Sequence, residues 1–255
     1  MISPNAKGKV AWITGAGKGI GRALARRLAE EGWTVAASAR TAEDLVSLAA
    51  ESPQGSVHPF PMDVSATQSI GPTIDRIEQT LGLIDLAVLN AGTHTPMPAE
   101  EFSVATIRNL MEINFFGTVN CLEHLVPQCI ERRRGHIAVV ASLAGYRGLP
   151  TAAAYGATKA ALINMCESLK PELERHGVLL TLINPGFVKT PLTDRNAFPM
   201  PFLIDANKAA EYICRGLETS VFEISFPRGF AVIMKFLRLL PDRLFFTLSR
   251  RMIRQ

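Results

Sequence analysis

The sequence has few of the residues that cross-link a protein or bind metals. Only four of its 255 residues are cysteines, and no two of them form a C-x-x-C pair. We interpret them as reduced thiols of a cytosolic protein rather than as a disulfide framework. The five histidines have no metal-ligand spacing either, so no bound metal is expected.

Targeting and membrane-spanning signals are also missing. The first residues lack the basic stretch and long apolar run of a signal peptide. No run of about 18 residues is free of charge, as a transmembrane helix would require. We see no linker, internal repeat or low-complexity segment, and the length suits one large α/β domain. We therefore expect a cytoplasmic protein.

Charge is unevenly distributed along the chain. The net charge is +4, but residues 221–255 hold seven Lys/Arg and two Asp/Glu, which gives this segment +5. The other 220 residues carry 20 basic and 21 acidic side chains. This asymmetry indicates an anionic surface as a partner of the C-terminal segment. No nucleic-acid binding is expected.

Apolar runs alternate with helical patterns over most of the chain. Strands are expected at residues 9–16, 34–39, 57–64, 83–91, 135–142, 178–185 and 222–227. Helices are expected at residues 19–32, 41–51, 66–81, 103–133, 152–176 and 205–219. Continuous apolar strands separated by helices predict a doubly wound α/β fold, in which helices cover both faces of a parallel sheet.

The first strand and the first helix are joined by the glycine-rich stretch "TGAGKGIG", residues 14–21. Gly15 permits a tight turn, Gly19 lets the backbone approach a pyrophosphate, and Gly21 lets helix and strand pack closely. The N–H groups at the helix N-terminus can then bind phosphate oxygens. The pattern predicts a dinucleotide site, although a glycine-rich turn without a ligand is the alternative.

The end of the second strand bears on which dinucleotide is bound. The sequence there is "SART", so no carboxylate is placed to hold a ribose 2′-hydroxyl. Arg40 can instead bind a 2′-phosphate through paired hydrogen bonds, and Lys18 adds a second positive charge. We therefore expect NADP(H). The alternative is that both are solvated surface cations.

Three residues form a candidate catalytic set. Tyr155 and Lys159 are four residues apart on a predicted helix and so share one face, and Ser142 closes the preceding strand. A phenol has a pKa near 10, which a nearby ammonium would lower. Tyr155 could then exchange a proton with a substrate oxygen, and Ser142 could hydrogen-bond the same oxygen. The Y-x-x-x-K spacing alone is common on helix surfaces.

Seven features together make the chain resemble the short-chain dehydrogenase/reductase family over about residues 8–225. They are "TGAGKGIG" (14–21), "MDV" (62–64), "LNAG" (89–92), Asn114, Ser142, "YGATK" (155–159) and "NPGFVKT" (184–190). The resemblance implies a Rossmann-like sheet of seven parallel strands and hydride transfer between a nicotinamide cofactor and an alcohol or carbonyl. One departure is Leu89, where the family usually has asparagine.

The resemblance also implies roles for individual residues. Tyr155 is the general acid/base, Lys159 lowers its pKa and binds the nicotinamide ribose, and Ser142 orients the substrate oxygen. Asn114 holds a water in the proton relay. The implied cofactor-binding residues are Gly15, Lys18, Gly19, Ile20, Gly21, Arg40, Asp63, Val64, Asn90, Ala91, Gly92, Tyr155, Lys159, Pro185, Gly186 and Thr190. His94 is expected at the surface near the mouth of the cleft. A homodimer through helices 103–133 and 152–176 is also implied.

The segment 187–205 covers the substrate in the family. Its apolar residues here are Phe187, Leu192, Phe198, Met200, Phe202 and Leu203. They favour a lipophilic alcohol, aldehyde or ketone as substrate, although internal packing would explain them equally well. Two other functions stay open: reduction of carrier-bound acyl groups, and a non-catalytic NADPH sensor or scaffold.

Residues 228–255 extend beyond the catalytic region, residues 1–227. A helix is expected at residues 229–240, and Pro241 separates it from a second helix at residues 242–254. The second helix has a basic face with Arg243, Thr247, Arg250, Arg251 and Arg254, and an opposite apolar face with Leu244, Phe245, Leu248 and Met252. This pattern predicts peripheral association with an anionic membrane. The alternative is a tail that packs on the body over the cleft or a subunit interface.

Overall fold

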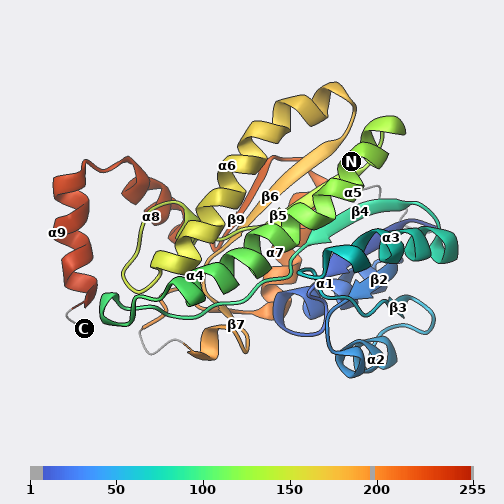
Figure 1. The fold of residues 1–255 in the computed structure, drawn as a ribbon, viewed down its shortest axis with the longest axis horizontal. Coiled ribbons are helices and arrows are strands. Elements are labelled where there is room, and N and C mark those ends of the chain that lie inside the picture. The colour runs from blue at the N-terminus through green and yellow to red at the C-terminus, as the bar shows by residue number, and fades with distance from the viewer. Residues whose placement is uncertain (1–7, 196–198, 254–255) are drawn as a thin grey trace.

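A seven-stranded parallel sheet forms the centre of the protein, in a computed structural model that describes residues 8–195 and 199–253. The strand order is β3-β2-β1-β4-β5-β6-β9, and helices cover both faces (Figure 1). The strands are β1 (Val10–Thr14), β2 (Thr34–Ser38), β3 (Val57–Pro59), β4 (Ile84–Leu89), β5 (His136–Val140), β6 (Leu179–Pro185) and β9 (Glu223–Phe226). The predicted doubly wound fold is confirmed, and each predicted strand is present.

Two hydrophobic clusters lie on opposite faces of this sheet. Along β1, Val10 and Trp12 belong to one cluster, whereas Ala11 and Ile13 belong to the other, because successive side chains of a strand point to opposite faces. The helices α3 (Thr67–Leu81), α5 (Gly117–Glu131) and α6 (Ala153–Arg175) cover the first face. The helices α1 (Gly19–Glu30), α2 (Ala42–Ala50) and α7 (Ala206–Glu218) cover the second. Burial on both faces explains why the strands read as continuous apolar runs.

The helix predicted over residues 103–133 is interrupted by a wide turn. The α-helix α4 (Val104–Met111) passes into the π-helical turn η2 (Glu112–Phe116) before α5 begins. Asn114 lies in this turn and is fully buried. Apolar periodicity does not signal a single π turn, which adds one residue to the hydrogen-bonded loop, so the sequence predicted one continuous helix.

Two short strands that were not predicted close the segment after β6. The pair β7 (Val188–Lys189) and β8 (Ile204–Asp205) is parallel and holds the two ends of this segment together. The remaining short elements are the 3-10 turns η1 (Ala99–Glu101), η3 (Leu143–Gly145) and η4 (Thr193–Arg195).

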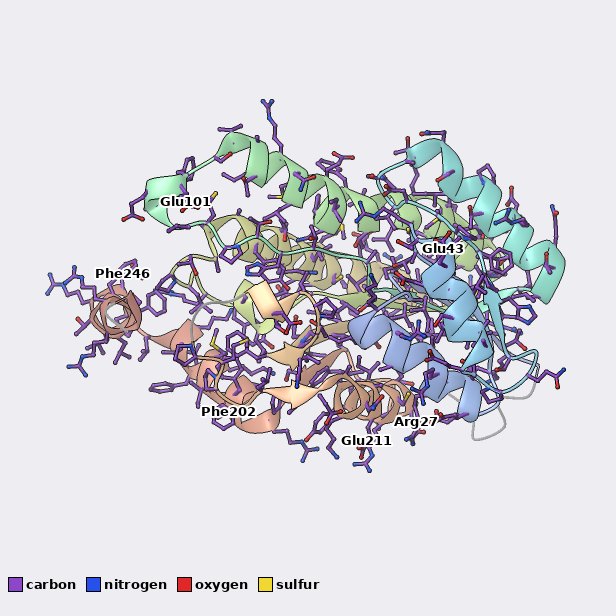
Figure 2. The ribbon with its side chains drawn as sticks, turned by 90° about the horizontal axis from the view of Figure 1, so that it is seen from below. Arg27, Glu43, Glu101, Phe202, Glu211 and Phe246 are labelled. Atoms are coloured by element: carbon purple, nitrogen blue, oxygen red, sulfur yellow. The ribbon has the colours of Figure 1, made fainter. Side chains whose placement is uncertain are left out.

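The C-terminal segment forms two helices that meet at Pro241, as predicted. The first, α8 (Arg228–Leu239), buries Ala231, Met234 and Leu237 in the same cluster as α5 and α6. The second, α9 (Asp242–Ile253), stands at the end of the molecule furthest from β3 (Figures 1 and 2). Arg254 and the side chain of Met252, both part of the predicted amphipathic pattern, lie outside the described part of the chain.

A partly buried carboxylate connects α8 to the sheet. The Glu223 carboxylate of β9 accepts hydrogen bonds from Lys235 Nζ of α8 at 2.5 Å, from Asn184 Nδ2 of β6 at 2.8 Å, and from the Tyr146 hydroxyl. Burial alone would raise the pKa of Glu223, but these donors lower it below its ordinary value. The carboxylate is therefore charged at neutral pH, and it joins α8 to β9, β6 and the segment after β5.

His136 at the start of β5 predicts how stability depends on pH. Its Nε2 donates to Thr181 Oγ1 at 2.9 Å, since that hydroxyl itself donates to the Val221 carbonyl oxygen. Burial lowers the pKa of His136 from 6.5 to about 4. The unfolded chain takes up a proton below pH 6.5, whereas the folded protein does not until about pH 4. This stabilisation is therefore complete above pH 6.5 and lost as the pH falls toward 4.

Urea unfolding at pH 7 and pH 5 tests this. The wild-type protein should lose ~2 kcal/mol more unfolding free energy between the two pH values than the His136→Gln variant, which cannot titrate there. An equal loss in both proteins would show that carboxylates, and not His136, cause the acid sensitivity.

Candidate functional site

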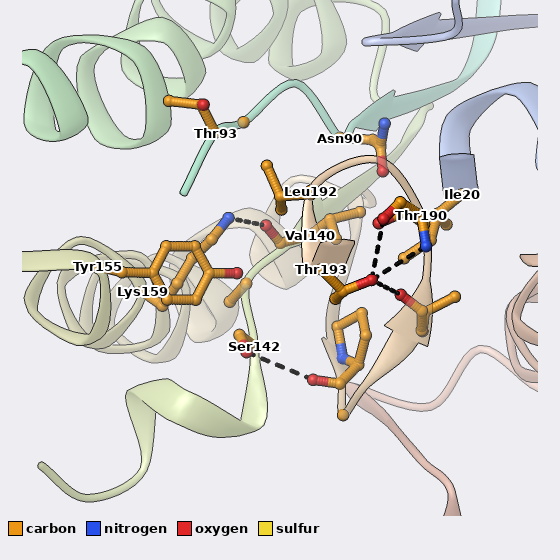
Figure 3. A pocket seen from close by; sticks show the side chains of 15 residues that line it. Ile20, Asn90, Thr93, Val140, Ser142, Tyr155, Lys159, Thr190, Leu192 and Thr193 are labelled. Carbon is orange, nitrogen blue, oxygen red and sulfur yellow. Dashed lines mark hydrogen bonds between the residues drawn. The ribbon is translucent and has the colours of Figure 1, made fainter. Parts of the chain in front are cut away.

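The candidate site lies at the carboxyl ends of β1, β4, β5 and β6, where the sheet connects to its loops. A cavity of about 110 Å³ opens there between the glycine loop and the start of α6 (Figure 3). It is lined by Ile20, Asn90, Gly92, Thr93, Val140, Ala141, Ser142, Tyr155, Lys159, Pro185, Gly186, Val188, Thr190, Leu192 and Thr193. A groove of about 430 Å³ shares several of these residues and continues past the glycine loop toward Arg40 and Asp63.

The glycine loop is shaped as the sequence predicts, and a side chain would clash at Gly15, Gly19 and Gly21. A Cβ atom at Gly21 would lie 2.3 Å from the Gly15 carbonyl oxygen. Gly19 has φ +56°, and a Cβ there would lie 2.9 Å from Thr190 Cγ2. Gly21 therefore allows close packing inside the loop, whereas Gly15 and Gly19 line the groove without side chains, so a diphosphate can approach the backbone there.

Thr14 and Asn90 hold this loop against the end of β4. The Thr14 hydroxyl accepts from the backbone N–H groups of Asn90 and Ala91 at 3.0 and 3.1 Å. Asn90 Nδ2 donates to the carbonyl oxygens of Thr14 and Gly15 at 3.0 and 3.2 Å. Asn90 thus fixes the loop in addition to lining the cavity. Sequence reasoning missed Thr14, although it begins the motif.

The far end of the groove contains both predicted cations and one unpredicted carboxylate. Arg40, Lys18 and Asp44 all line it, and Arg40 is exposed. Lys18 Nζ lies 3.3 Å from Asp44 Oδ2. Asp44 stands in the first turn of α2, one residue beyond Glu43, the nearest carboxylate noted in the sequence. A negative charge therefore competes for Lys18 where a 2′-phosphate was expected.

Asp63 and Val64 line the same groove, as predicted. Asp63 Oδ1 accepts from Ser65 N at 3.0 Å and from Ser65 Oγ at 2.7 Å. Burial would raise the pKa of Asp63, but these hydrogen bonds and the charge of Arg40 lower it. Asp63 is therefore an ionised acceptor at neutral pH.

Tyr155, Lys159 and Ser142 come together on one wall of the cavity, where the Tyr155 hydroxyl points inward (Figure 3). Burial raises the pKa of Tyr155, and its hydrogen bond with Ser142 counters this only in part. The lowering of this pKa expected from Lys159 stays a prediction, since burial and the Ser142 hydroxyl account for the shift. A phenol in this environment is protonated at neutral pH.

Lys159 is 3% exposed and donates from Nζ to the Val140 carbonyl oxygen at 2.9 Å. Its Nζ also lies 5.8 Å from the centre of the Tyr155 ring. Burial lowers the pKa of Lys159 to about 8, so the group is mainly charged at neutral pH and loses its charge above pH 8.

Ser142 is buried at the carboxyl end of β5. Its hydroxyl accepts from Ala144 N at 3.1 Å and donates to the Pro185 carbonyl oxygen at 3.4 Å. The second bond is long and hence weak, so the hydroxyl can turn to another acceptor in the cavity.

Asn114 is buried outside the lining of the cavity, and both its side-chain oxygen and its side-chain nitrogen form hydrogen bonds with protein groups. Its Oδ1 accepts from Thr93 N at 2.7 Å, and its Nδ2 donates to Thr93 O at 2.9 Å and to Thr158 Oγ1 at 3.1 Å. The side chain thus fixes the segment after β4 against α6. The relay role stays a prediction.

His94 differs from its expected surface position. It is buried, and its ring lies edge-on to that of Tyr155 with the centroids 4.7 Å apart. Sequence reasoning placed it near the cleft but could not see that residues 93–97 fold back over the start of α6, where Met97 forms a bridge with Ala152.

The segment 187–205 contributes fewer apolar residues to the cavity than expected. Leu192 lines it, as do Pro185, Gly186 and Thr190. Phe187 and Phe202 instead stack on Phe230 of α8, with ring centroids 5.4 and 5.9 Å apart. Leu203 is exposed, and Phe198 lies outside the described residues. Packing on α8 therefore accounts for Phe187, whereas Phe202 stacks there but stays 52% exposed.

Comparisons with known proteins identify related sequences and folds. The family model described as short chain dehydrogenase matches residues 9–198. An uncharacterized oxidoreductase of Myxococcus xanthus is 38% identical over 246 residues, which cover 96% of this chain and 97% of the relative. A crystal structure of a short chain dehydrogenase from Burkholderia cenocepacia in complex with NADP is 28% identical, with a TM-score of 0.82, and covers 97% of this chain and 98% of that one. A 3-oxoacyl-[acyl-carrier protein] reductase from Brucella melitensis is also 28% identical, with a TM-score of 0.76, and covers 88% of this chain and 92% of that one.

Proposed function

Because the chain belongs to the short chain dehydrogenase family, we propose that it transfers hydride between NADP(H) and a lipophilic alcohol, aldehyde or ketone. The observation that carries this proposal is the meeting of Ser142, Tyr155 and Lys159 on one wall of a cavity beside the glycine loop. A proton donor, a second hydrogen-bond donor and a buried cation can stabilise and protonate a carbonyl oxygen while its carbon accepts hydride.

The residues of the groove fit a dinucleotide. Gly15 and Gly19 line the groove without side chains and leave the backbone open to a diphosphate, Asp63 offers an ionised acceptor, and Arg40 offers a guanidinium to a 2′-phosphate. NADP(H), when bound, supplies or accepts the hydride. The neighbour from Burkholderia cenocepacia, which holds NADP, supports this cofactor.

Proton transfer falls to Tyr155 in the proposed mechanism. Its protonated phenol donates to the substrate oxygen during reduction, and Ser142 donates a second hydrogen bond to the same oxygen. Lys159 places a positive charge beside the phenol, which favours the phenolate that remains after the proton leaves. Asn114 positions this wall through Thr93 and Thr158.

Val140, Val188 and Leu192 support an apolar substrate, since they give the cavity an aliphatic wall. The test is the initial rate of NADPH consumption across a homologous series of straight-chain aldehydes and ketones. We expect kcat/KM to rise about fourfold for each methylene that this wall buries, the equivalent of about 0.8 kcal/mol. A flat series would remove the lipophilic substrate from the proposal.

A 3-ketoacyl thioester belongs in the same panel. Similarity to the Brucella melitensis reductase makes reduction of carrier-bound acyl groups the second candidate. Preference for the thioester over every simple carbonyl would favour it. Failure of all these carbonyls to react despite NADPH binding would favour a non-catalytic sensor.

The homodimer through residues 103–133 and 152–176 stays a prediction. Val104 and Phe116 are exposed within the first of these ranges.

A further inference from the structure

The two C-terminal helices leave an apolar surface uncovered. On α8, the side opposite its buried residues carries Val232, Ile233, Phe236 and Leu239 at helical spacing. Phe236 is 61% exposed and Leu239 is 82% exposed. Beyond Pro241, α9 exposes Leu244, Phe246 and Leu248, and Figure 2 shows Phe246 at the end of the molecule that α9 forms. We call these seven residues the tail surface. Large exposed patches of this kind mark interaction sites.

The inner sides of the same helices contact the body, so the exposure does not reflect a detached tail. Phe245 is 3% exposed, with the Arg147 guanidinium 4.5 Å from its ring centre. The same Arg147 pairs with Asp242 at 2.5 Å. Arg147 lies just after η3, which begins next to Ser142, so α9 is fixed beside the segment that bounds the candidate site.

The charges of the tail divide in the same way. Lys235 pairs with Glu223 and Arg238 lies 4.0 Å from Glu167, so these cations face the body. Arg243, Arg250 and Arg251 of α9 are exposed, on the face opposite Phe245. An amphipathic surface with arginines beside exposed leucine and phenylalanine matches the interface of an anionic bilayer.

We propose that the tail surface binds the face of an anionic lipid bilayer, with Phe236, Leu239 and Phe246 inserted among the acyl chains and the α9 arginines at the headgroups. Within residues 8–195 and 199–253, every helix is too short or too polar to cross a bilayer, so the contact is peripheral. A second copy of the chain is the less favourable occupant. A two-fold contact would bring together two segments that each carry +5, whereas anionic lipid neutralises them.

Cosedimentation of the full chain with vesicles tests this. Vesicles of phosphatidylcholine and phosphatidylglycerol in equal amounts should bind the protein at low salt, and binding should weaken as salt is raised. Pure phosphatidylcholine vesicles should bind much less. The full chain is needed because α8 forms part of the core. Failure to bind anionic vesicles at low salt overturns the proposal.

Matched double variants separate the contribution of the apolar side chains to vesicle binding from that of the arginines. Phe236→Gln with Leu239→Gln should lower the affinity roughly tenfold or more, whereas Val46→Gln with Leu83→Gln, two exposed apolar residues of the body, should not. Arg250→Gln with Arg251→Gln should lower it by roughly thirtyfold. Arg133→Gln with Arg175→Gln, which removes the same charge from the body, should have little effect.

Equal losses in tail and body variants overturn the proposal, because they indicate a nonspecific effect. Light scattering of the wild type and the Phe236/Leu239 variant tests whether a second copy of the chain covers the tail surface. A mass that falls only in the variant, without vesicle binding by the wild type, would assign the tail surface to a subunit contact instead. None of these readouts depends on catalytic activity. The membrane proposal is therefore tested independently of the proposed reaction.

Discussion

Replacing Tyr155 with phenylalanine should lower kcat about a thousandfold, while the dissociation constant for NADPH stays within about twofold of the wild-type value. The hydroxyl is the proposed proton donor, and general acid catalysis contributes about 100-fold to 10,000-fold to a rate. The ring itself is kept, so its edge contact with His94 and the cavity wall should persist. Steady-state kinetics and fluorescence titration with NADPH measure the two quantities.

Tyr212→Phe is the matched control, because it removes a phenolic hydroxyl from α7, where the ring stacks on Phe226. Its kcat should match the wild-type value. Retention of more than about a tenth of the activity by the Tyr155→Phe variant would assign proton transfer to another group.

The second large effect concerns cofactor choice. Arg40→Ala should weaken NADPH binding by roughly 10-fold to 100-fold, because charge-assisted hydrogen bonds contribute about 1.5–3 kcal/mol. NADH binding should change little, since NADH has no 2′-phosphate. Titration of both cofactors against both proteins gives the comparison, and an equal loss for the two cofactors would remove Arg40 from a phosphate site.

Asp44→Asn provides a variant with the opposite expectation. Asp44 holds Lys18 at 3.3 Å, so its neutralisation should release Lys18 and tighten NADPH binding severalfold. If this variant instead weakens NADH and leaves NADPH unchanged, Asp44 is an acceptor for the ribose hydroxyl, and the expected preference for NADP(H) is wrong.

The secondary structure could be predicted from the sequence because the pattern repeats. Most strands of the main sheet are apolar runs, and the helices between them are amphipathic, so the predicted ends of β1, α3 and α6 differ from the observed ones by a few residues at most. The π turn around Asn114 could not be predicted, because a one-residue change in helical hydrogen bonding leaves the apolar pattern intact.

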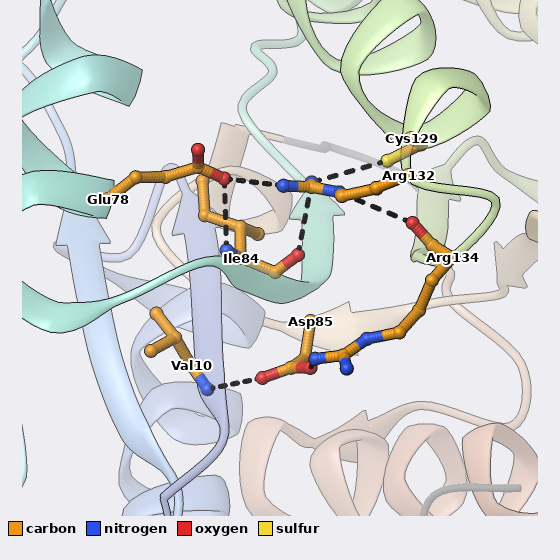
Figure 4. A network of polar contacts seen from close by, with 7 residues as sticks. All are labelled: Val10, Glu78, Ile84, Asp85, Cys129, Arg132 and Arg134. Carbon is orange, nitrogen blue, oxygen red and sulfur yellow. Dashed lines mark hydrogen bonds and ion pairs between the residues drawn. The ribbon is translucent and has the colours of Figure 1, made fainter.

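Long-range polar contacts could not be predicted either. Figure 4 shows an example at the amino ends of β1 and β4, opposite the candidate site. Glu78 of α3 accepts from Arg132 after α5 at 2.9 Å and from the Ile84 backbone N–H at 3.1 Å. Asp85 accepts from Val10 N at 3.1 Å and pairs with Arg134 at 2.5 Å. Except for the contact between Glu78 and Ile84, these contacts join residues that are 49 or more positions apart in the sequence. Nothing in the local sequence of these residues indicates which of them pair.

The candidate site, too, combines features that the sequence predicted with features that it did not. Motif spacing placed Ser142, Tyr155 and Lys159 together because they belong to one strand, loop and helix. It could not show that burial raises the pKa of Tyr155, that Asp44 pairs with Lys18, or that His94 packs on the Tyr155 ring. Each of these depends on how separate segments pack in three dimensions.

The central claim is hydride transfer to a carbonyl carbon, and an isotopic label follows it directly. The wild-type protein is incubated with a lipophilic aldehyde and NADPH deuterated at the transferable position of the nicotinamide, and the alcohol is analysed by mass spectrometry. Our account predicts an alcohol with one deuterium on the former carbonyl carbon, and almost no product with the Tyr155→Phe variant. Alcohol without deuterium, or equal deuterated product from both proteins, would contradict it.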